Sequence, residues 1–212
     1  MTPAQLLMAT FLGLTLAQPA ATDLKFTSLD LQSHANQRLK DDFHSTNSEA
    51  NNLTALPAGQ QRLDGIIFDI GESLIQLGCT QIKDKPDKVE GIRVDQSFGR
   101  LHILHAAAFN SEPNTVIGLY VIRYADGARE NMEIVYGQNV SDWWYDDEDK
   151  EPAVLKIAWM GDNELAKKAG KKIRLYHAVW KNPYPEKKVA CIDLLTAEGS
   201  NSAPFCIAMT VE

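Results

Sequence analysis

Short strand-like segments recur along most of this chain, separated by turns rich in Gly, Pro, Asn and Asp. The strongest local signal is the Asp126-Gly127 pair, which separates two apolar-rich runs at residues 116–124 and 129–136. Glycine accepts the positive φ that a tight turn needs, so these two runs predict a β-hairpin. Similar segments lie at residues 23–31, 65–70, 73–77, 92–95, 100–106, 153–159, 173–180, 189–195 and 205–211.

The order of these segments limits the fold class. Residues 162–169 (DNELAKKA) are the one helical candidate after the N-terminal region, with Asp and Asn at the start and Gly170 after the end. About ten strands without a strand–helix–strand rhythm predict an all-β fold, an antiparallel β-sandwich of the jelly-roll type. We expect a single domain over residues 22–212, with a long polar loop at about 33–60 of the kind that often carries function.

An apolar run at residues 6–17 (LLMATFLGLTLA) lies near the N-terminus. A run of about a dozen residues is too short to span a bilayer, which takes roughly 20, but it suits the core of a signal peptide. We therefore expect a signal peptide over residues 1–21, cleaved near 17–21, and a chain exported to the periplasm or the extracellular space without a membrane span. No Lys or Arg precedes the run, so a buried N-terminal helix is the alternative.

The charge balance argues against one class of partner. Lys and Arg number 21 and Asp and Glu number 28, which gives a formal net charge of −7. Nucleic-acid binding needs a cationic surface to meet the phosphates, so we expect no nucleic-acid partner. A basic surface that binds membranes is disfavoured for the same reason.

The cysteines and histidines form no pattern typical of a metal site or an activated nucleophile. Cys79, Cys191 and Cys206 are odd in number, so they cannot all pair, and their spacing fits no zinc site. We expect all three to be structural, with Cys191 and Cys206 on the two strands of one hairpin. His102 and His105 lie on opposite faces of their predicted strand because side chains alternate, which disfavours a shared metal. The other three histidines are scattered along the chain.

The densest cluster of informative side chains lies at residues 140–151 (VSDWWYDDEDKE). In an extended segment Trp143 and Tyr145 share one face and Trp144 lies on the other. Indole rings stack on sugar rings, and the carboxylate of Asp142 beside them can accept hydrogen bonds from sugar hydroxyls. The alternative is that these aromatic rings close the end of the core while the acids are solvated.

A second aromatic turn lies at residues 180–185 (WKNPYP). Each proline holds the preceding residue in an extended conformation, so the turn is stiff. It could present Trp180, Asn182 and Tyr184 as the edge of a ligand site. The alternative is a simple hairpin turn with Trp180 packed beneath it.

Cofactors and catalytic groups have little support in the sequence. Asp146, Asp147 and Asp149 could offer oxygen ligands to calcium, but the spacing of an EF-hand loop is absent. No G-x-S-x-G elbow, P-loop or G-x-G-x-x-G motif is present, so no catalytic residue is assigned.

Six stretches carry a resemblance that covers about residues 24–212. They are 63–78 (LDGIIFDIGESLIQLG), 85–106 (KPDKVEGIRVDQSFGRLHILHA), 117–127 (IGLYVIRYADG), 133–144 (EIVYGQNVSDWW), 173–195 (IRLYHAVWKNPYPEKKVACIDLL) and 203–212 (APFCIAMTVE). Together they resemble a β-sandwich family of exported or surface proteins from environmental bacteria, and more loosely the novel carbohydrate-binding modules and discoidin-like jelly rolls. The most recognisable residues are Tyr136, Gly137, Asp142, Trp143, Trp144, Trp180, Asn182 and Pro183. The resemblance implies a sandwich fold and recognition of a glycan or a surface, and it assigns no catalytic residue.

The leading hypothesis is an exported, non-catalytic module that binds carbohydrate through residues 142–149 and the turn at 180–184. One alternative is a structural or protein-interaction domain of the cell envelope, which burial of Trp143 and Trp144 would favour because buried rings cannot stack on a sugar. A third possibility is a jelly-roll glycan hydrolase, which needs two carboxylates about 5–10 Å apart in one cleft.

Overall fold

The computed structural model describes residues 25–44, 50–146, 148 and 153–212. It confirms the all-β class, because the described residues form strands with one short helix, α1 (Glu164–Lys168). The strands are β1 (Thr27–Ser28), β2 (Gln37–Arg38), β3 (Gly59–Leu63), β4 (Ile66–Ile70), β5 (Ser73–Gln76), β6 (Lys88–Gln96), β7 (Arg100–Ala108), β8 (Val116–Tyr124), β9 (Arg129–Val135), β10 (Trp144–Tyr145), β11 (Ile157–Gly161), β12 (Lys172–Lys181), β13 (Val189–Thr196) and β14 (Ala203–Val211). The predicted signal peptide over residues 1–21 lies outside the described residues.

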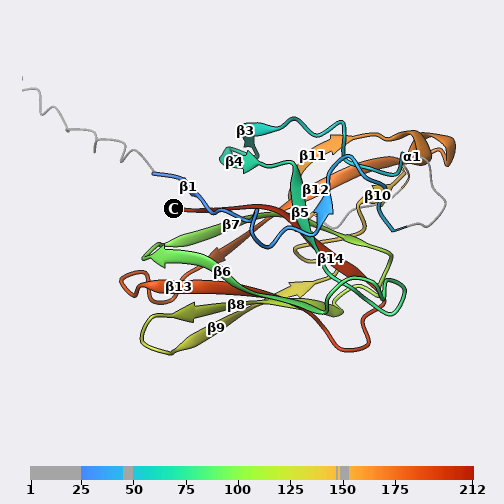
Figure 1. The fold of residues 1–212 in the computed structure, drawn as a ribbon. Coiled ribbons are helices and arrows are strands. Elements are labelled where there is room, and N and C mark those ends of the chain that lie inside the picture. The colour runs from blue at the N-terminus through green and yellow to red at the C-terminus, as the bar shows by residue number, and fades with distance from the viewer. Residues whose placement is uncertain (1–24, 45–49, 147, 149–152) are drawn as a thin grey trace, which may run out of the picture.

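Two antiparallel sheets form the layers of a jelly roll (Figure 1). The large sheet contains β5, β14, β7 and β12 in that order, and the small sheet contains β6, β13, β8 and β9. Along the chain these strands alternate between the two sheets, apart from β8 and β9, which are neighbours in the small sheet. This alternation is the double Greek-key order of a jelly roll, as the strand pattern predicted.

The predicted hairpin at Asp126-Gly127 is confirmed. β8 and β9 pair antiparallel, with Arg123 opposite Arg129 at the end next to the turn. Gly127 has a φ of 88°, which glycine reaches without the steric penalty that a Cβ atom would bring. The sequence pattern therefore located the turn and both strands correctly.

A third layer covers the outer face of the large sheet. β3 and β4 form a hairpin whose turn residues, Asp64 and Gly65, both have positive φ, as a tight two-residue turn requires. The Thr210 hydroxyl of β14 donates a hydrogen bond to the Ile67 carbonyl at 2.8 Å, and Phe68 is fully buried. Every residue of β14 is buried, because the small sheet covers one face and the other is covered by this hairpin together with the rings of Phe43, His44 and Trp143.

In its described parts, residues 33–44 and 50–60, the polar segment is mostly irregular and includes β2 and the first residues of β3. Its large apolar side chains, Leu39, Phe43, Leu53 and Leu56, are buried in the core. These four side chains anchor the described parts of the segment to the sandwich.

Three local predictions were wrong. The strand expected at 153–159 begins at Ile157, after a turn, and the strand expected at 23–31 has only two residues. Cys191 and Cys206 do not share a hairpin, because β13 belongs to the small sheet and β14 to the large one. All three cysteines are free thiols. In the described part of the chain no helix has the length and apolar character to cross a membrane.

Candidate functional site

Trp143 lies in the core rather than on the surface. Its side chain is 2% exposed, and its ring centroid lies 5.4 Å from that of Phe43, 5.6 Å from that of His44 and 5.9 Å from that of Phe205. A ring enclosed by these neighbours has no face free for a sugar. Its placement matches the alternative in which the aromatic cluster closes the core.

Trp144 is half-buried, and the side-chain amide of Asn51 links it to two other segments. Its indole Nε1 donates to Oδ1 of Asn51 at 3.2 Å. The same oxygen accepts a hydrogen bond from Asn163, the N-cap of α1, at 3.2 Å, while Nδ2 of Asn51 donates to the Phe43 carbonyl at 2.8 Å. Asn51 therefore ties the polar segment to the aromatic cluster and to the helix.

Asp142 and Tyr145 are also engaged locally. Asp142 accepts a hydrogen bond from the backbone N–H of Trp144 at 3.0 Å. Burial raises the pKa of Asp142 to about 6, and the nearby charge of Arg174 offsets part of that effect. The Arg174 guanidinium lies 4.3 Å from the ring centroid of Tyr145, whose hydroxyl donates to the sulfur of Met160 at 3.2 Å. Both side chains thus support the local structure.

The second aromatic turn is held by Asn182. This side chain is 2% exposed; its Oδ1 accepts hydrogen bonds from the Tyr124 hydroxyl at 2.6 Å and the Tyr184 N–H at 2.9 Å. Its Nδ2 donates to the Phe98 carbonyl at 2.9 Å. Trp180 is half-buried beside Phe98, whereas Tyr184 is 41% exposed. Of the seven predicted ligand-binding residues, Tyr184 is the most exposed, and its ring contacts Tyr124 and Lys187.

The structure does not bring the two aromatic segments together. Trp144 pairs with Ile173 at the start of β12, and Trp180 lies seven residues further along the same strand. At about 3.3 Å per residue this separation is roughly 23 Å. The two segments therefore lie at different places along β12 and do not form one cluster of side chains.

The acidic candidates for calcium are only partly within the described residues. Asp146 forms an ion pair of 2.7 Å with Lys171, while Asp147 and Asp149 lie outside the described residues. Over residues 25–44, 50–146, 148 and 153–212, no group of three or more His, Cys, Asp and Glu side chains is placed to hold a metal ion.

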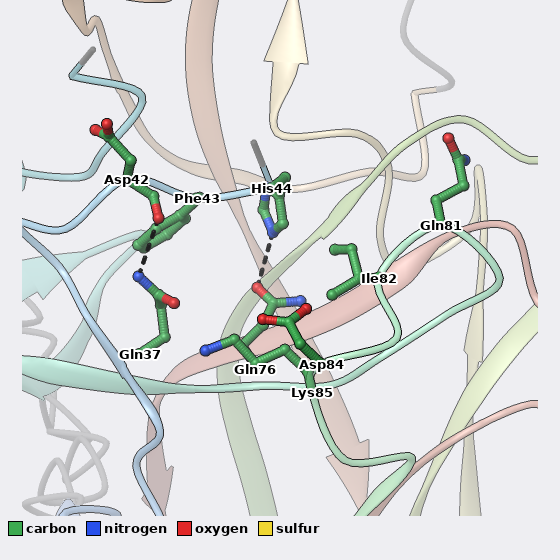
Figure 2. A pocket seen from close by; sticks show the side chains of 9 residues that line it. All are labelled: Gln37, Asp42, Phe43, His44, Gln76, Gln81, Ile82, Asp84 and Lys85. Carbon is green, nitrogen blue, oxygen red and sulfur yellow. Dashed lines mark hydrogen bonds between the residues drawn. The ribbon is translucent and has the colours of Figure 1, made fainter. Parts of the chain in front are cut away.

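A polar hollow lies beside the aromatic core, and we call it the His44 pocket (Figure 2). Its volume is about 480 Å³, within the range of about 300–1,000 Å³ typical of small-molecule sites. Its lining residues come from the polar segment 33–60, from β5 and from the connection between β5 and β6. They are Gln37, Asp42, Phe43, His44, Gln76, Gln81, Ile82, Asp84 and Lys85.

His44 has one buried nitrogen without a partner. Its Nε2 lies 2.9 Å from Oε1 of Gln76, whose amide nitrogen donates to the Leu77 carbonyl, so Nε2 is the donor. The other ring nitrogen, Nδ1, is buried and makes no hydrogen bond. Burial lowers the pKa of His44 to about 4, so the imidazole is neutral at pH 7 and Nδ1 is an acceptor. Such an orphaned acceptor is typical of a place where a ligand or water donates a hydrogen bond.

Other groups in the His44 pocket keep spare hydrogen-bonding capacity. Lys85 uses one of its three ammonium hydrogens on the Asn36 carbonyl at 3.0 Å. One carboxylate oxygen of Asp42 accepts from the Asn51 N–H at 3.0 Å, which leaves the second oxygen. The pocket can therefore offer donors and acceptors to a polar molecule without breaking its own contacts.

Trp143 packs behind the wall of this pocket. Its ring contacts Phe43 and His44, which both line the wall, while Trp143 itself is not among the lining residues. The polar segment at 33–60, expected to carry function, supplies Gln37, Asp42 and His44. The sequence reasoning missed the partners from β5 onward, because only long-range folding brings Gln76 beside His44.

Comparison with known proteins assigns the chain to no family. No protein-family model matches the chain, and no curated protein matches it in sequence.

Proposed function

We propose that this protein is an exported, non-catalytic module that binds a hydroxyl-rich ligand of the carbohydrate class in the His44 pocket. The observation that carries the proposal is the lining of a 480 Å³ cavity by three glutamine side chains, two carboxylates, one ammonium group and a neutral imidazole with an unpaired acceptor. Sugar hydroxyls donate and accept at once, and amides and carboxylates are their natural partners. Phe43 and Ile82 supply the smaller apolar part of the wall.

The charges narrow the ligand class. Asp42 and Asp84 bring two negative charges against one positive charge from Lys85. A ligand that carries a carboxylate or phosphate would meet net repulsion, since like charges in a partly desolvated site oppose each other. We therefore expect a neutral sugar or an amino sugar rather than an acidic one.

The test is a glycan-array screen of the wild-type protein, followed by titration of the best-bound glycan against Asp84→Asn. This substitution keeps the size of the side chain and removes its charge, so we expect at least a tenfold loss of affinity, about 1.4 kcal/mol, in line with the loss of a charge-assisted hydrogen bond. Glu112→Gln is the matched control, because it removes an exposed carboxylate that does not line the pocket. Equal affinities for the two variants would place the ligand elsewhere.

A structural or protein-interaction role in the cell envelope is the second candidate. The burial of Trp143 favours it, because the aromatic cluster then serves the core. This role becomes the preferred one if the wild-type protein binds no glycan on the array while its circular dichroism spectrum shows that it is folded.

A further inference from the structure

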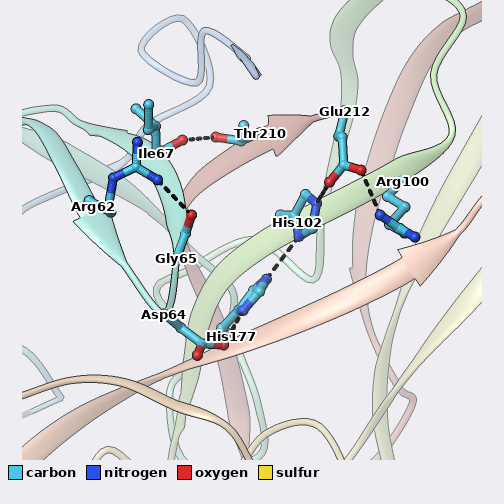
Figure 3. A network of polar contacts seen from close by, with 9 residues as sticks. All are labelled: Arg62, Asp64, Gly65, Ile67, Arg100, His102, His177, Thr210 and Glu212. Carbon is cyan, nitrogen blue, oxygen red and sulfur yellow. Dashed lines mark hydrogen bonds and ion pairs between the residues drawn. The ribbon is translucent and has the colours of Figure 1, made fainter. Parts of the chain in front are cut away.

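A chain of titratable side chains lies between the β3–β4 hairpin and the large sheet (Figure 3). The Asp64 carboxylate, in the hairpin turn, lies 2.7 Å from Nδ1 of His177 on β12. Nε2 of His177 lies 3.0 Å from Nδ1 of His102 on β7, and Nε2 of His102 lies 3.0 Å from the Glu212 carboxylate. Arg100 ends the chain with an ion pair of 2.6 Å to Glu212.

Both imidazoles are shielded from water. His102 is 3% exposed and His177 is 5% exposed. Phe68 of the hairpin packs edge-on against His177, and Phe26 packs in the same manner against His102. The hairpin therefore covers His177, and its own turn supplies the carboxylate at that end of the chain.

The hydrogen-bonded series from Asp64 through His177 and His102 to Glu212 can hold only a defined number of protons. Its three contacts, from Asp64 to His177, from His177 to His102 and from His102 to Glu212, each need one hydrogen. Two neutral imidazoles bring two hydrogens and two carboxylates bring none, so one added proton supplies the hydrogen for the third contact. A second added proton has no place, because the 3.0 Å contact between the two ring nitrogens holds only one hydrogen.

The surrounding charges agree with this limit. Burial lowers the pKa of His102 and of His177, while hydrogen bonds to Glu212 and Asp64 act in the opposite direction. The charge of Lys156, which precedes β11, lowers the pKa of His177 further.

His102 meets two further positive groups. Arg100 and a protonated His177 both lower the pKa of His102. Protonation of both rings is therefore unfavourable while they remain buried side by side.

We propose that the hydrogen-bonded series of Asp64, His177, His102 and Glu212 is an acid-operated latch. It holds the β3–β4 hairpin on the large sheet and releases it when both imidazoles are protonated. Two imidazoliums would place N–H groups face to face at the contact between His102 and His177. Lifting the hairpin leaves both rings on the large sheet, but it lets water solvate protonated His177 and so lowers the cost of the second charge. The device is independent of ligand binding in the His44 pocket.

Hydrogen–deuterium exchange of the full chain between pH 7.5 and pH 5 tests the latch. After correction for intrinsic exchange rates, we expect the amides of β3 and β4 to exchange at least tenfold faster at pH 5, measured relative to those of β8 and β9. The small sheet serves as the internal reference because global unfolding would expose it equally. A constant ratio between hairpin and small sheet over this pH range would overturn the proposal.

Two variants should change the acid release of the hairpin in opposite directions. His102→Gln offers a carbonyl to His177 and an amide N–H to Glu212 without a second titratable ring, so acid release should disappear. Asp64→Asn removes an anion that stabilises protonated His177 only while the hairpin is closed. Protonation of His177 then favours the lifted hairpin more strongly, so release should begin at higher pH. Asp69→Asn, an exposed position on the same hairpin, is the control and should behave like the wild-type protein. Acid release that persists unchanged in His102→Gln would contradict the latch, even if Asp64→Asn failed to fold.

Discussion

Lowering the pH from 7 to 4 is expected to remove several kcal/mol from the free energy of unfolding. Burial lowers the pKa of His44 and the pKa of His105 from 6.5 to about 4. As the pH falls below 6.5, the unfolded chain binds protons that the folded chain excludes. The stabilisation is thus complete above about pH 6.5 and is lost as the pH approaches 4. At about 1.4 kcal/mol per pKa unit, each of these histidines contributes on the order of 3 kcal/mol.

Urea unfolding at a series of pH values from 7.5 to 4.5 measures this loss. A substitution of His105 gives the clearer test, because both ring nitrogens have polar partners. They lie 3.2 Å from the Tyr120 hydroxyl and 2.9 Å from the Asn139 carbonyl. His105→Gln retains polar contacts but cannot titrate, so its stability should fall less steeply, by up to about 1.4 kcal/mol per pH unit. A free energy of unfolding that stays constant from pH 7.5 to 4.5 would contradict the neutral, buried state of these imidazoles.

Replacing Trp143 with alanine is expected to lower the free energy of unfolding by about 3–5 kcal/mol. The ring is 2% exposed and packs against Phe43, His44 and Phe205, so its removal leaves a cavity in the core. Ligand affinity should fall as well, because two of these neighbours line the His44 pocket. Urea unfolding at pH 7.5 gives the stability, with the midpoint shift as the direct readout.

Trp180→Ala is the matched control for this prediction. Trp180 is half-buried beside Phe98 and lies about 23 Å along β12 from the aromatic cluster, so we expect a smaller loss of about 1–2 kcal/mol and no change in affinity. If the two tryptophan variants lose the same stability, Trp143 is not the core residue described above.

The sequence was sufficient for the fold class because the strand signals are local. The Asp126-Gly127 turn fixed the β8–β9 hairpin, and the absence of long helical segments excluded alternating β–α topologies. The β3–β4 hairpin was missed although it too has an Asp-Gly pair at its turn, because the strand before it (GQQRL) is polar. Its burial depends on the outer face of the large sheet, which only the assembled fold reveals.

The candidate site was harder to predict, because its parts are distant in sequence. Alternation along residues 143–145 anticipated the burial pattern, with Trp143 and Tyr145 buried and Trp144 half-buried. What the segment faces depends on Phe43 and His44, about a hundred residues earlier. The pairing of His102 with His177 likewise requires the register of β7 against β12, which one sequence does not specify.

A sugar that enters the His44 pocket should change the NMR signals of the side chains in the pocket wall, and a titration with sugars measures this change. The side-chain amide signals of Gln37 and Gln81, each assigned by a single Gln→Glu substitution, report on the pocket wall. Glucose, galactose, mannose, N-acetylglucosamine and glucosamine would be titrated into the wild-type protein in turn. We expect at least one of them to shift these signals in a saturable manner while the Trp180 indole signal stays unchanged. Shifts confined to the Trp180 indole and the Tyr184 ring, or no saturable shift with any of the five sugars, would contradict a sugar site in the His44 pocket.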